Sequence, residues 1–149
     1  MIRLVEVDPV EWLERARPLF EASYYEVMQG VGIPPPQIDM DTFTKLVEME
    51  MALAVVALTA EDEIIGYTFS YLVPLFLYGG MKVMNNESLF VRADHRGITS
   101  VRLIRATEVA AKARGAARMQ WHTRPGTKAE GLFSRMKYHN FDNAWSKEL

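Results

Sequence analysis

The feature that most constrains the fold is a pair of apolar segments separated by a short acidic turn. Residues 52–58 form an uninterrupted apolar run, and residues 64–73 are rich in β-branched and aromatic side chains. Runs of this length and composition are typical of buried strands. The acidic residues 61–63 between them predict the turn of a β-hairpin. We therefore expect a β-sheet with this hairpin inside it.

Other segments alternate between strand and helix patterns around the hairpin. Further strands are predicted at residues 2–7, 81–91, 118–123 and 141–146, with a bulge at Asn85–Asn86. Asp8 and Pro9 predict a helix start, Pro18 a break, and further helices are predicted at residues 41–48, 101–114 and 128–137. The order β-α-α-β-β-β-α-β-α-β predicts an α/β (α+β) fold with a mixed sheet, in one domain over residues 1–149.

Composition excludes several classes of site. The 149 residues include no cysteine, which excludes disulfides, thiolate metal sites and a cysteine nucleophile. His95, His122 and His139 lack ligand spacing, so no metal is expected. No apolar run is long enough to span a bilayer, and the first residues lack the apolar core of a signal peptide. We expect a cytoplasmic protein without a membrane partner.

Charge is divided unevenly along the chain. Residues 1–91 carry 5 Lys/Arg and 14 Asp/Glu, whereas residues 92–149 carry 12 Lys/Arg and 5 Asp/Glu. One interpretation is two solvated faces. The other is that the basic half meets a phosphorylated partner, a nucleotide cofactor or a nucleic acid, while the acidic half meets a cation.

A basic turn at residues 92–100 precedes the helix predicted at residues 101–114. A turn that leads into a helix presents unpaired backbone N–H groups and the positive end of the helix dipole, which suits a diphosphate. Arg96 adds a charge, and Thr99 and Ser100 add hydroxyl donors. The stretch matches neither a P-loop nor a dinucleotide fingerprint, so a simple capped helix is the alternative.

Three motifs in this order resemble the GNAT N-acetyltransferase superfamily. Residues 64–67 resemble its third strand, and Phe90–Val91 followed by Arg96–Gly97 resembles its acetyl-CoA loop, Arg/Gln-x-x-Gly-x-Gly/Ala. Ala129, Phe133 and residues 136–138 resemble its last helix, Ala-x-x-x-Tyr-x-x-Leu-Gly-Phe. Thr99 and Val101 replace the small residues of the loop, and Phe133 replaces the tyrosine that often serves as the acid.

The resemblance implies transfer of an acetyl group from acetyl-CoA to a primary amine, by direct attack in a ternary complex. It places the cofactor where strands 81–91 and 118–123 diverge. Glu87 is the predicted base and His122 the second candidate, while Asn86 and Ser88 would orient a water or the acceptor. The predicted cofactor-binding residues are Leu89, Phe90, Val91, Arg96, Gly97, Ile98, Thr99, Ser100, Val101 and Phe133.

The family's acceptor site involves the first two helices, which here are acidic at Glu21, Glu26, Asp39 and Asp41. We expect a cationic acceptor: a lysine side chain, a protein N-terminus or a polyamine-like molecule. Tyr24, Tyr25, Glu26 and Tyr67 are its predicted binding residues, and the apolar loop 75–78 is either an acceptor wall or a homodimer contact.

Two other functions stay open. A GNAT-like fold without catalysis could serve as a binding module, which the residues at positions 99, 101 and 133 favour. Alternatively, the helix bearing Arg102, Arg105, Lys112 and Arg114 could bind nucleic acid, although it lacks interleaved aromatic residues and is not the partner we expect.

Overall fold

The computed structural model describes residues 1–28 and 30–149. These residues form one five-stranded sheet in the order β1-β2-β3-β4-β5, in which β4 and β5 are parallel and the other neighbours antiparallel. Its strands are β1 (Arg3–Val7), β2 (Ala52–Leu58), β3 (Ile64–Leu75), β4 (Met81–Val91) and β5 (Arg118–Gln120). The helices are α1 (Pro9–Arg15), α2 (Arg17–Ser23), α3 (Met40–Glu48), α4 (Ile98–Ala113) and α5 (Lys128–Arg135). Short helical turns lie at Tyr24–Met28 (a π-helix), Phe76–Tyr78 and Ala93–His95.

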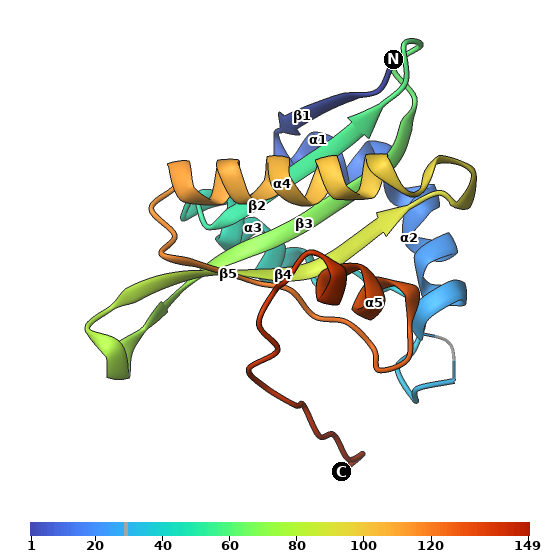
Figure 1. Ribbon diagram of the computed structural model, residues 1–149. Coiled ribbons are helices and arrows are strands. Elements are labelled where there is room, and N and C mark those ends of the chain that lie inside the picture. The colour runs from blue at the N-terminus through green and yellow to red at the C-terminus, as the bar shows by residue number, and fades with distance from the viewer. Residues whose placement is uncertain (29) are drawn as a thin grey trace.

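Helices cover both faces of the sheet, as Figure 1 shows with α4 across one face and α1 to α3 behind it. The two faces have separate apolar cores. Side chains of α1, α2 and α3 join one core with Tyr67, Phe69 and Phe90, and Leu103 of α4 joins the other with Leu53. Every residue of β2 is buried, as the uninterrupted apolar run predicted.

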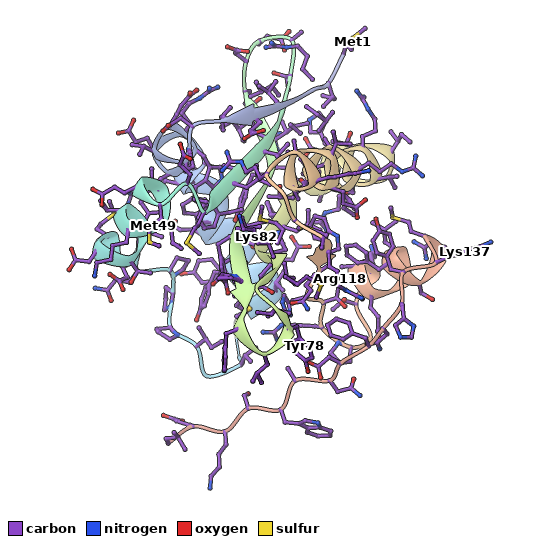
Figure 2. The ribbon with its side chains drawn as sticks, turned by 90° about the vertical axis from the view of Figure 1, so that its left-hand side faces the viewer. Met1, Met49, Tyr78, Lys82, Arg118 and Lys137 are labelled. Carbon is purple, nitrogen blue, oxygen red and sulfur yellow. The ribbon has the colours of Figure 1, made fainter. Side chains whose placement is uncertain are left out.

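The predicted hairpin is confirmed, and β3 extends two residues further than predicted. Residues 74 and 75 still pair with β4, followed by a helical turn at Phe76–Tyr78. Pro74 is tolerated at this end of β3 because β2 pairs with β3 only as far as Tyr71, so β2 needs no N–H from residue 74. The hairpin of β3 and β4 projects beyond the rest of the sheet (Figure 1), and Tyr78, labelled in Figure 2, lies in the turn at its end.

The N-terminal helix is broken, as predicted, but at Ala16 rather than at Pro18. Pro18 lies in the first turn of α2, where its missing N–H costs nothing. Asp8 caps α1 by accepting from the Val10 N–H at 2.8 Å. Helix α3 begins at Met40 because Asp39, not Asp41, accepts the N–H of Thr42.

The predicted last strand is wrong. Residues 141–146 form no strand, and Phe141 and Trp145 are 57% and 93% exposed. Their alternating pattern is interrupted by Asp142 and Asn143, residues that favour turns. The neighbouring elements are shorter than predicted at their C-terminal ends, β5 at Gln120 and α5 at Arg135, whereas α4 begins three residues earlier.

Candidate active site

Strands β4 and β5 pair only briefly and then separate. Their parallel pairing covers Val83–Asn85 on β4 and Arg118–Gln120 on β5, whereas β4 continues to Val91. Over its last six residues β4 is paired with β3 alone, so its other edge offers backbone N–H and C=O groups. The predicted divergence of these strands is confirmed.

Gly66 holds β3 close to the open end of β4. A Cβ atom at Gly66 would lie 2.9 Å from the Phe90 carbonyl oxygen, so a side chain there would push the strands apart. The close approach of β3 and β4 therefore explains why residues 64–67 include a glycine. The same pairing holds Leu89, Phe90 and Val91, three of the predicted cofactor-binding residues, against the centre of the sheet.

Gly97 is the N-cap of helix α4, and no side chain of the described residues caps the helix. The φ of Gly97 is +91°, a value that side-chain-bearing residues rarely adopt. Thr99 is buried, Ile98 is 71% exposed, and the Val101 N–H bonds back to the Gly97 carbonyl at 3.3 Å. The first turn of the helix thus leaves amide N–H groups available to an anion.

Arg96 fixes the turn. Its Nε donates to the Val91 carbonyl at 2.8 Å, its Nη2 pairs with Glu26 at 2.6 Å, and its guanidinium carbon lies 5.7 Å from the centre of the Phe90 ring. The structure thus brings together Arg96 and Glu26, for which the sequence predicted separate roles in binding cofactor and acceptor. The carboxylate of Glu26 is occupied by this pair and does not line the pocket described below.

A β-bulge interrupts β4 at Glu87. Phe69 pairs with Ser88 and Ser70 pairs with Asn86, which leaves Glu87 without a partner on β3. Asn86 holds this geometry, since its Nδ2 donates to the carbonyls of Phe69 (3.2 Å) and Ser88 (3.0 Å) and to the Ser70 hydroxyl (3.2 Å). A bulge turns two consecutive side chains toward one face. Glu87 and Ser88 accordingly both line one pocket, and Asn86 does not.

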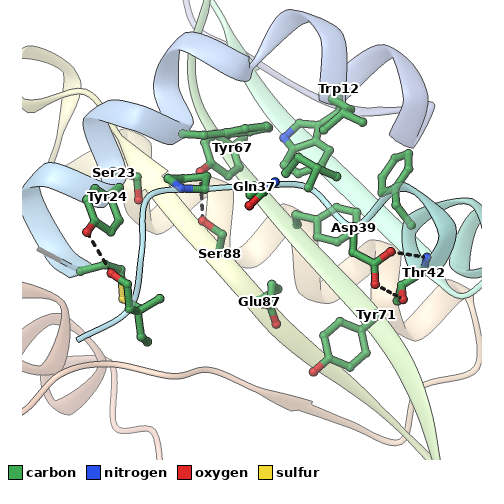
Figure 3. Close-up of a pocket in the computed structure, with 18 of the residues that line it drawn as sticks. Trp12, Ser23, Tyr24, Gln37, Asp39, Thr42, Tyr67, Tyr71, Glu87 and Ser88 are labelled. Atoms are coloured by element: carbon green, nitrogen blue, oxygen red, sulfur yellow. Dashed lines mark hydrogen bonds between the residues drawn. The ribbon is translucent and has the colours of Figure 1, made fainter. Parts of the chain in front are cut away.

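That pocket has a volume of about 600 Å³ and lies between the sheet and the helices of the first half of the chain. Figure 3 shows Glu87 and Ser88 next to each other on β4, with Tyr67 and Tyr71 on the neighbouring strand. Seven of the residues that line it are aromatic: Trp12, Phe20, Tyr24, Phe43, Tyr67, Phe69 and Tyr71. Seven others are apolar but not aromatic: Leu13, Met28, Ile33, Pro34, Pro36, Ile38 and Leu46. The polar lining residues are Ser23, Gln37, Asp39, Thr42, Glu87 and Ser88.

Hydrogen bonds fix several of these polar groups. The hydroxyls of Tyr67 and Ser88 are 3.0 Å apart, and burial raises the pKa of Tyr67, so its phenol stays protonated. The Thr42 hydroxyl, 2.6 Å from Asp39, holds the pKa of that carboxyl below its usual value. Tyr24 donates to the Ile33 carbonyl at 2.9 Å, which ties the π-helix to the proline-rich loop.

His122 lies outside the pocket but is connected to its rim. Its Nε2 is 2.8 Å from the Asn85 Oδ1, and the Asn85 Nδ2 donates to the Tyr71 hydroxyl at 2.7 Å. Sequence reasoning missed Asn85 and Tyr71 as members of this chain of bonds. The bulge shifts the register so that Asn85 and Tyr71 become cross-strand partners, which no local pattern indicates.

Phe133 is buried in an aromatic cluster that the sequence did not predict. Its ring lies 5.5 Å from Trp121 and 5.1 Å from Tyr138, measured between centroids. Glu108 of α4 accepts hydrogen bonds from both Trp121 and Tyr138. Burial, with Glu108 beside it, raises the pKa of Tyr138. The cluster joins α4 to α5.

The remaining predicted acceptor residue, Tyr25, is 60% exposed and packs edge-on against Tyr24 without lining the pocket. The apolar turn at Phe76–Tyr78 does not line it either. The described residues include no group of His, Cys, Asp or Glu placed to hold a metal ion. Within the same part of the chain, no helix is long and apolar enough to cross a membrane.

No protein-family model and no curated protein matches this sequence. Solved structures do match. An aminoglycoside acetyltransferase from an uncultured soil metagenomic sample has a TM-score of 0.76 and 18% identity, covering 100% of this chain and 99% of that one. The ribosomal-protein-alanine N-acetyltransferase from Brucella melitensis biovar Abortus 2308 has a TM-score of 0.72 and 16% identity, with both chains fully covered. A transcriptional regulator from Bacillus halodurans C-125 has a TM-score of 0.75 and 14% identity, also over both whole chains.

The chain therefore has the fold of the GNAT acetyltransferases, which confirms the predicted fold class. At these identities the likeness establishes the fold, whereas the activity has to be argued from the site.

Proposed function

We propose that this protein is an acetyl-CoA-dependent N-acetyltransferase acting on a primary amine. The observation that carries the proposal is the bulge at Glu87. It places a carboxylate at the opening of a pocket, beside the open end of β4 and ahead of the uncapped start of α4. This chemistry needs a base, an acceptor pocket and a backbone surface for a long cofactor. All three adjoin strand β4.

The described residues fit acetyl-CoA in two respects. Gly97 has the backbone conformation that opens the first turn of α4, and a Cβ there would meet nothing within 4 Å. Amides of Gly97–Ser100 would hold the diphosphate, since the Val101 N–H is already bonded to the Gly97 carbonyl. The open edge of Leu89–Val91 would bond the pantetheine amides as an added strand does. Phe133 would contribute apolar contact from α5.

Acetyl-CoA, when bound, supplies a thioester, whose thiol leaving group has a pKa of only about 8.5 and so needs no strong acid. Glu87 takes the proton from the ammonium group of the acceptor, directly or through a water, because its side chain borders both the pocket and the open strand edge. The amine would then attack the thioester carbon: the N–C bond forms, the C–S bond breaks, and the leaving CoA thiolate takes up the second proton that the nitrogen loses. His122 stays the second candidate base, since Asn85 connects it to the pocket rim.

The test is release of CoA thiol from acetyl-CoA in the presence of a panel of amines. Glu87→Gln keeps the size of the side chain but removes the base, and should lower kcat about 10²- to 10⁴-fold. Glu48→Gln, at an exposed site at the end of α3, is the matched control and should change nothing. If the Glu87→Gln variant turns over acetyl-CoA as fast as the wild type, Glu87 is not the base.

Cofactor binding is tested separately by thermal unfolding. Acetyl-CoA at about 100 times its Kd should stabilise the wild type by about 2.7 kcal/mol. Gly97→Val should weaken this effect, because a β-branched residue resists a φ of +91°. Gly126→Val is the control, since Gly126 also has a positive φ (+78°) but lies in the loop before α5.

The same measurements separate the two alternatives. Stabilisation by acetyl-CoA without turnover of any amine would favour a binding module. Nucleic-acid binding is disfavoured, because two of the basic side chains on and after α4 are already bonded within the fold. Arg102 donates to the Ile2 carbonyl, and Arg114 donates to the Ala52 carbonyl and also pairs with Glu6. Two of the four basic groups proposed for that role are therefore committed within the fold.

A further inference from the structure

We propose that the acceptor is a primary amine carried on an aromatic group, an arylalkylamine, with its ring inside the pocket and its amine at Glu87. This inference rests on the proposed function, since it names the substrate of that site. It also narrows the cationic acceptor expected from the sequence to one with a single charge and an apolar body.

Half of the apolar residues that line the pocket are aromatic and offer flat surfaces. Trp12, Phe20, Phe43, Tyr67 and Phe69 are all buried, each between 2% and 8% exposed. The Trp12 ring is stacked on Phe69 at 4.4 Å and 7°, and the ring of Phe20 lies 5.4 Å from Tyr67 at 73°. Aromatic rings prefer such stacked and edge-on neighbours, so the wall offers an aromatic guest the geometry its rings already use among themselves.

The interior gives little to a polar guest. The hydroxyls of Tyr67 and Ser88 are already bonded to each other, and the indole N–H of Trp12, buried without a partner among the described residues, can donate one hydrogen bond but cannot accept one from an ammonium group. A polyamine or aminosugar that entered the pocket would leave further ammonium groups or hydroxyls unpaired, at a cost of roughly several kcal/mol. An aromatic body avoids that cost.

The charges at the opening favour a cation. The carboxylates of Asp39 and Glu87 are the acidic groups that border the pocket, and none of the described residues that line it is Lys, Arg or His. Thr42 keeps Asp39 ionised by its two hydrogen bonds. The faces of the aromatic rings add attraction for an ammonium group. An amine with one charge and one apolar end therefore matches the opening and the wall at once.

The volume agrees with this class. About 600 Å³ lies within the range of roughly 300–1,000 Å³ that is typical of small-molecule sites. Phe69 and Glu87 lie beside each other on neighbouring strands, since Phe69 pairs with Ser88, the residue after Glu87. A ring near Phe69 and an amine at Glu87 would be joined by a short alkyl chain.

The test compares three amines as acceptors for the 149-residue chain: 2-phenylethylamine, 2-cyclohexylethylamine and spermidine. CoA release gives kcat/KM, and calorimetry gives the Kd of each amine independently of turnover. We expect 2-phenylethylamine to have the highest kcat/KM, the saturated ring to be about 3- to 10-fold poorer, and spermidine to be poorest. The comparison of the two ring amines isolates aromatic character from hydrophobicity.

Variants locate the effect. Phe43→Leu should raise the KM for 2-phenylethylamine about 3- to 10-fold with little change in kcat, and should reduce the preference over the saturated amine. Phe20→Leu is the second variant, used if thermal unfolding shows that Phe43→Leu is not folded. Tyr78→Leu removes a ring at the tip of the β3–β4 hairpin, outside the pocket, and should leave all three amines unchanged.

The outcomes separate this inference from the proposed function. Turnover of spermidine in preference to both ring amines would overturn the inference while the transferase assignment stands. Binding of 2-phenylethylamine with no turnover of any amine would support the aromatic-amine pocket and overturn the transfer reaction. If 2-phenylethylamine is neither bound nor turned over, the inference is overturned, whatever other amines do.

Discussion

The bulge that presents Glu87 depends on one amide, and replacing Asn86 by alanine should destabilise the protein more than its size suggests. Asn86 is only 4% exposed, and its Nδ2 contacts three acceptors at 3.0–3.2 Å. Each buried hydrogen bond of this kind contributes about 1 kcal/mol, and acceptors left without a donor add to the loss. We expect the free energy of unfolding to fall by about 2–4 kcal/mol, or roughly 5–12 °C in Tm for a chain of this length.

Denaturation by urea measures this loss, with an unchanged m-value as the sign that the unfolded state is not altered. Asn85→Ala is the matched control, because Asn85 is half-buried and its amide bonds the side chains of Tyr71 and His122 instead of the backbone. It should cost under about 1 kcal/mol. If the two variants unfold with equal free energies, or if Asn86→Ala stays within about 0.5 kcal/mol of the wild type, Asn86 does not hold the bulge.

Three further variants test other parts of the structure. Lys137→Gly should stabilise the protein by about 0.5–1 kcal/mol in thermal unfolding, whereas Lys137→Ala should bring no gain. The reason is that Lys137, two residues after the end of α5, has a φ of +61° and points into solvent (Figure 2). Thr107→Val should lower the free energy of unfolding by about 1–3 kcal/mol, because it leaves the buried Thr68 hydroxyl, 2.7 Å away, without its partner. Adding Thr68→Val should recover part of that loss. Strictly additive losses would contradict the pairing. Burial raises the pKa of Tyr67 above its value in the unfolded chain, so its contribution to the free energy of unfolding is complete below about pH 10 and is lost as pH rises further. Tyr67→Phe should therefore reduce the loss of stability that urea denaturation measures between about pH 9 and 11. Equal losses in both proteins would refute this.

Sequence patterns located two strands at their observed bounds, β2 and β4. Strand β2 is buried at every residue, and β4 is paired with β3 along nearly its whole length. The bulge was expected at Asn85–Asn86 and lies one residue further on, at Glu87. The sequence could not distinguish the residue that bulges from the residue that holds the bulge, because both are polar and only the backbone acceptors around Asn86 decide between them.

The strand expected at residues 141–146 failed for the opposite reason. Its apolar residues alternate locally, but a strand forms only where a neighbour supplies hydrogen bonds and cover, and Phe141 and Trp145 have neither burial nor pairing. The aromatic pocket was equally hidden. Trp12, Phe43 and Phe69 come from α1, α3 and β3, and each belongs to an ordinary apolar pattern of its own element.

The uneven charge of the chain acquires a different meaning in the folded protein. Acidic residues of the first half pair with arginines of the second in Glu6–Arg114 (2.5 Å), Glu26–Arg96 (2.6 Å) and Glu63–Arg92 (2.6 Å). These pairs are partly exposed, so each contributes only about 0–1 kcal/mol. They nevertheless account for part of the charge that the sequence assigned to outside partners.

Two consequences follow for the candidate site. Because Arg96 is paired with Glu26 and donates to the Val91 carbonyl, its role in the structure is to hold the end of β4 against the start of α4. An anion at that turn would then depend chiefly on backbone amides, whose number is set by the conformation at Gly97 and not by local net charge. On the acceptor side, Glu26 is paired with Arg96, whereas Asp39 and Glu87 line the pocket and are not involved in any ion pair found among the described residues. One of the four acidic residues that made a polycation attractive is therefore paired within the fold, and the two carboxylates at the pocket suit one ammonium group on an apolar body.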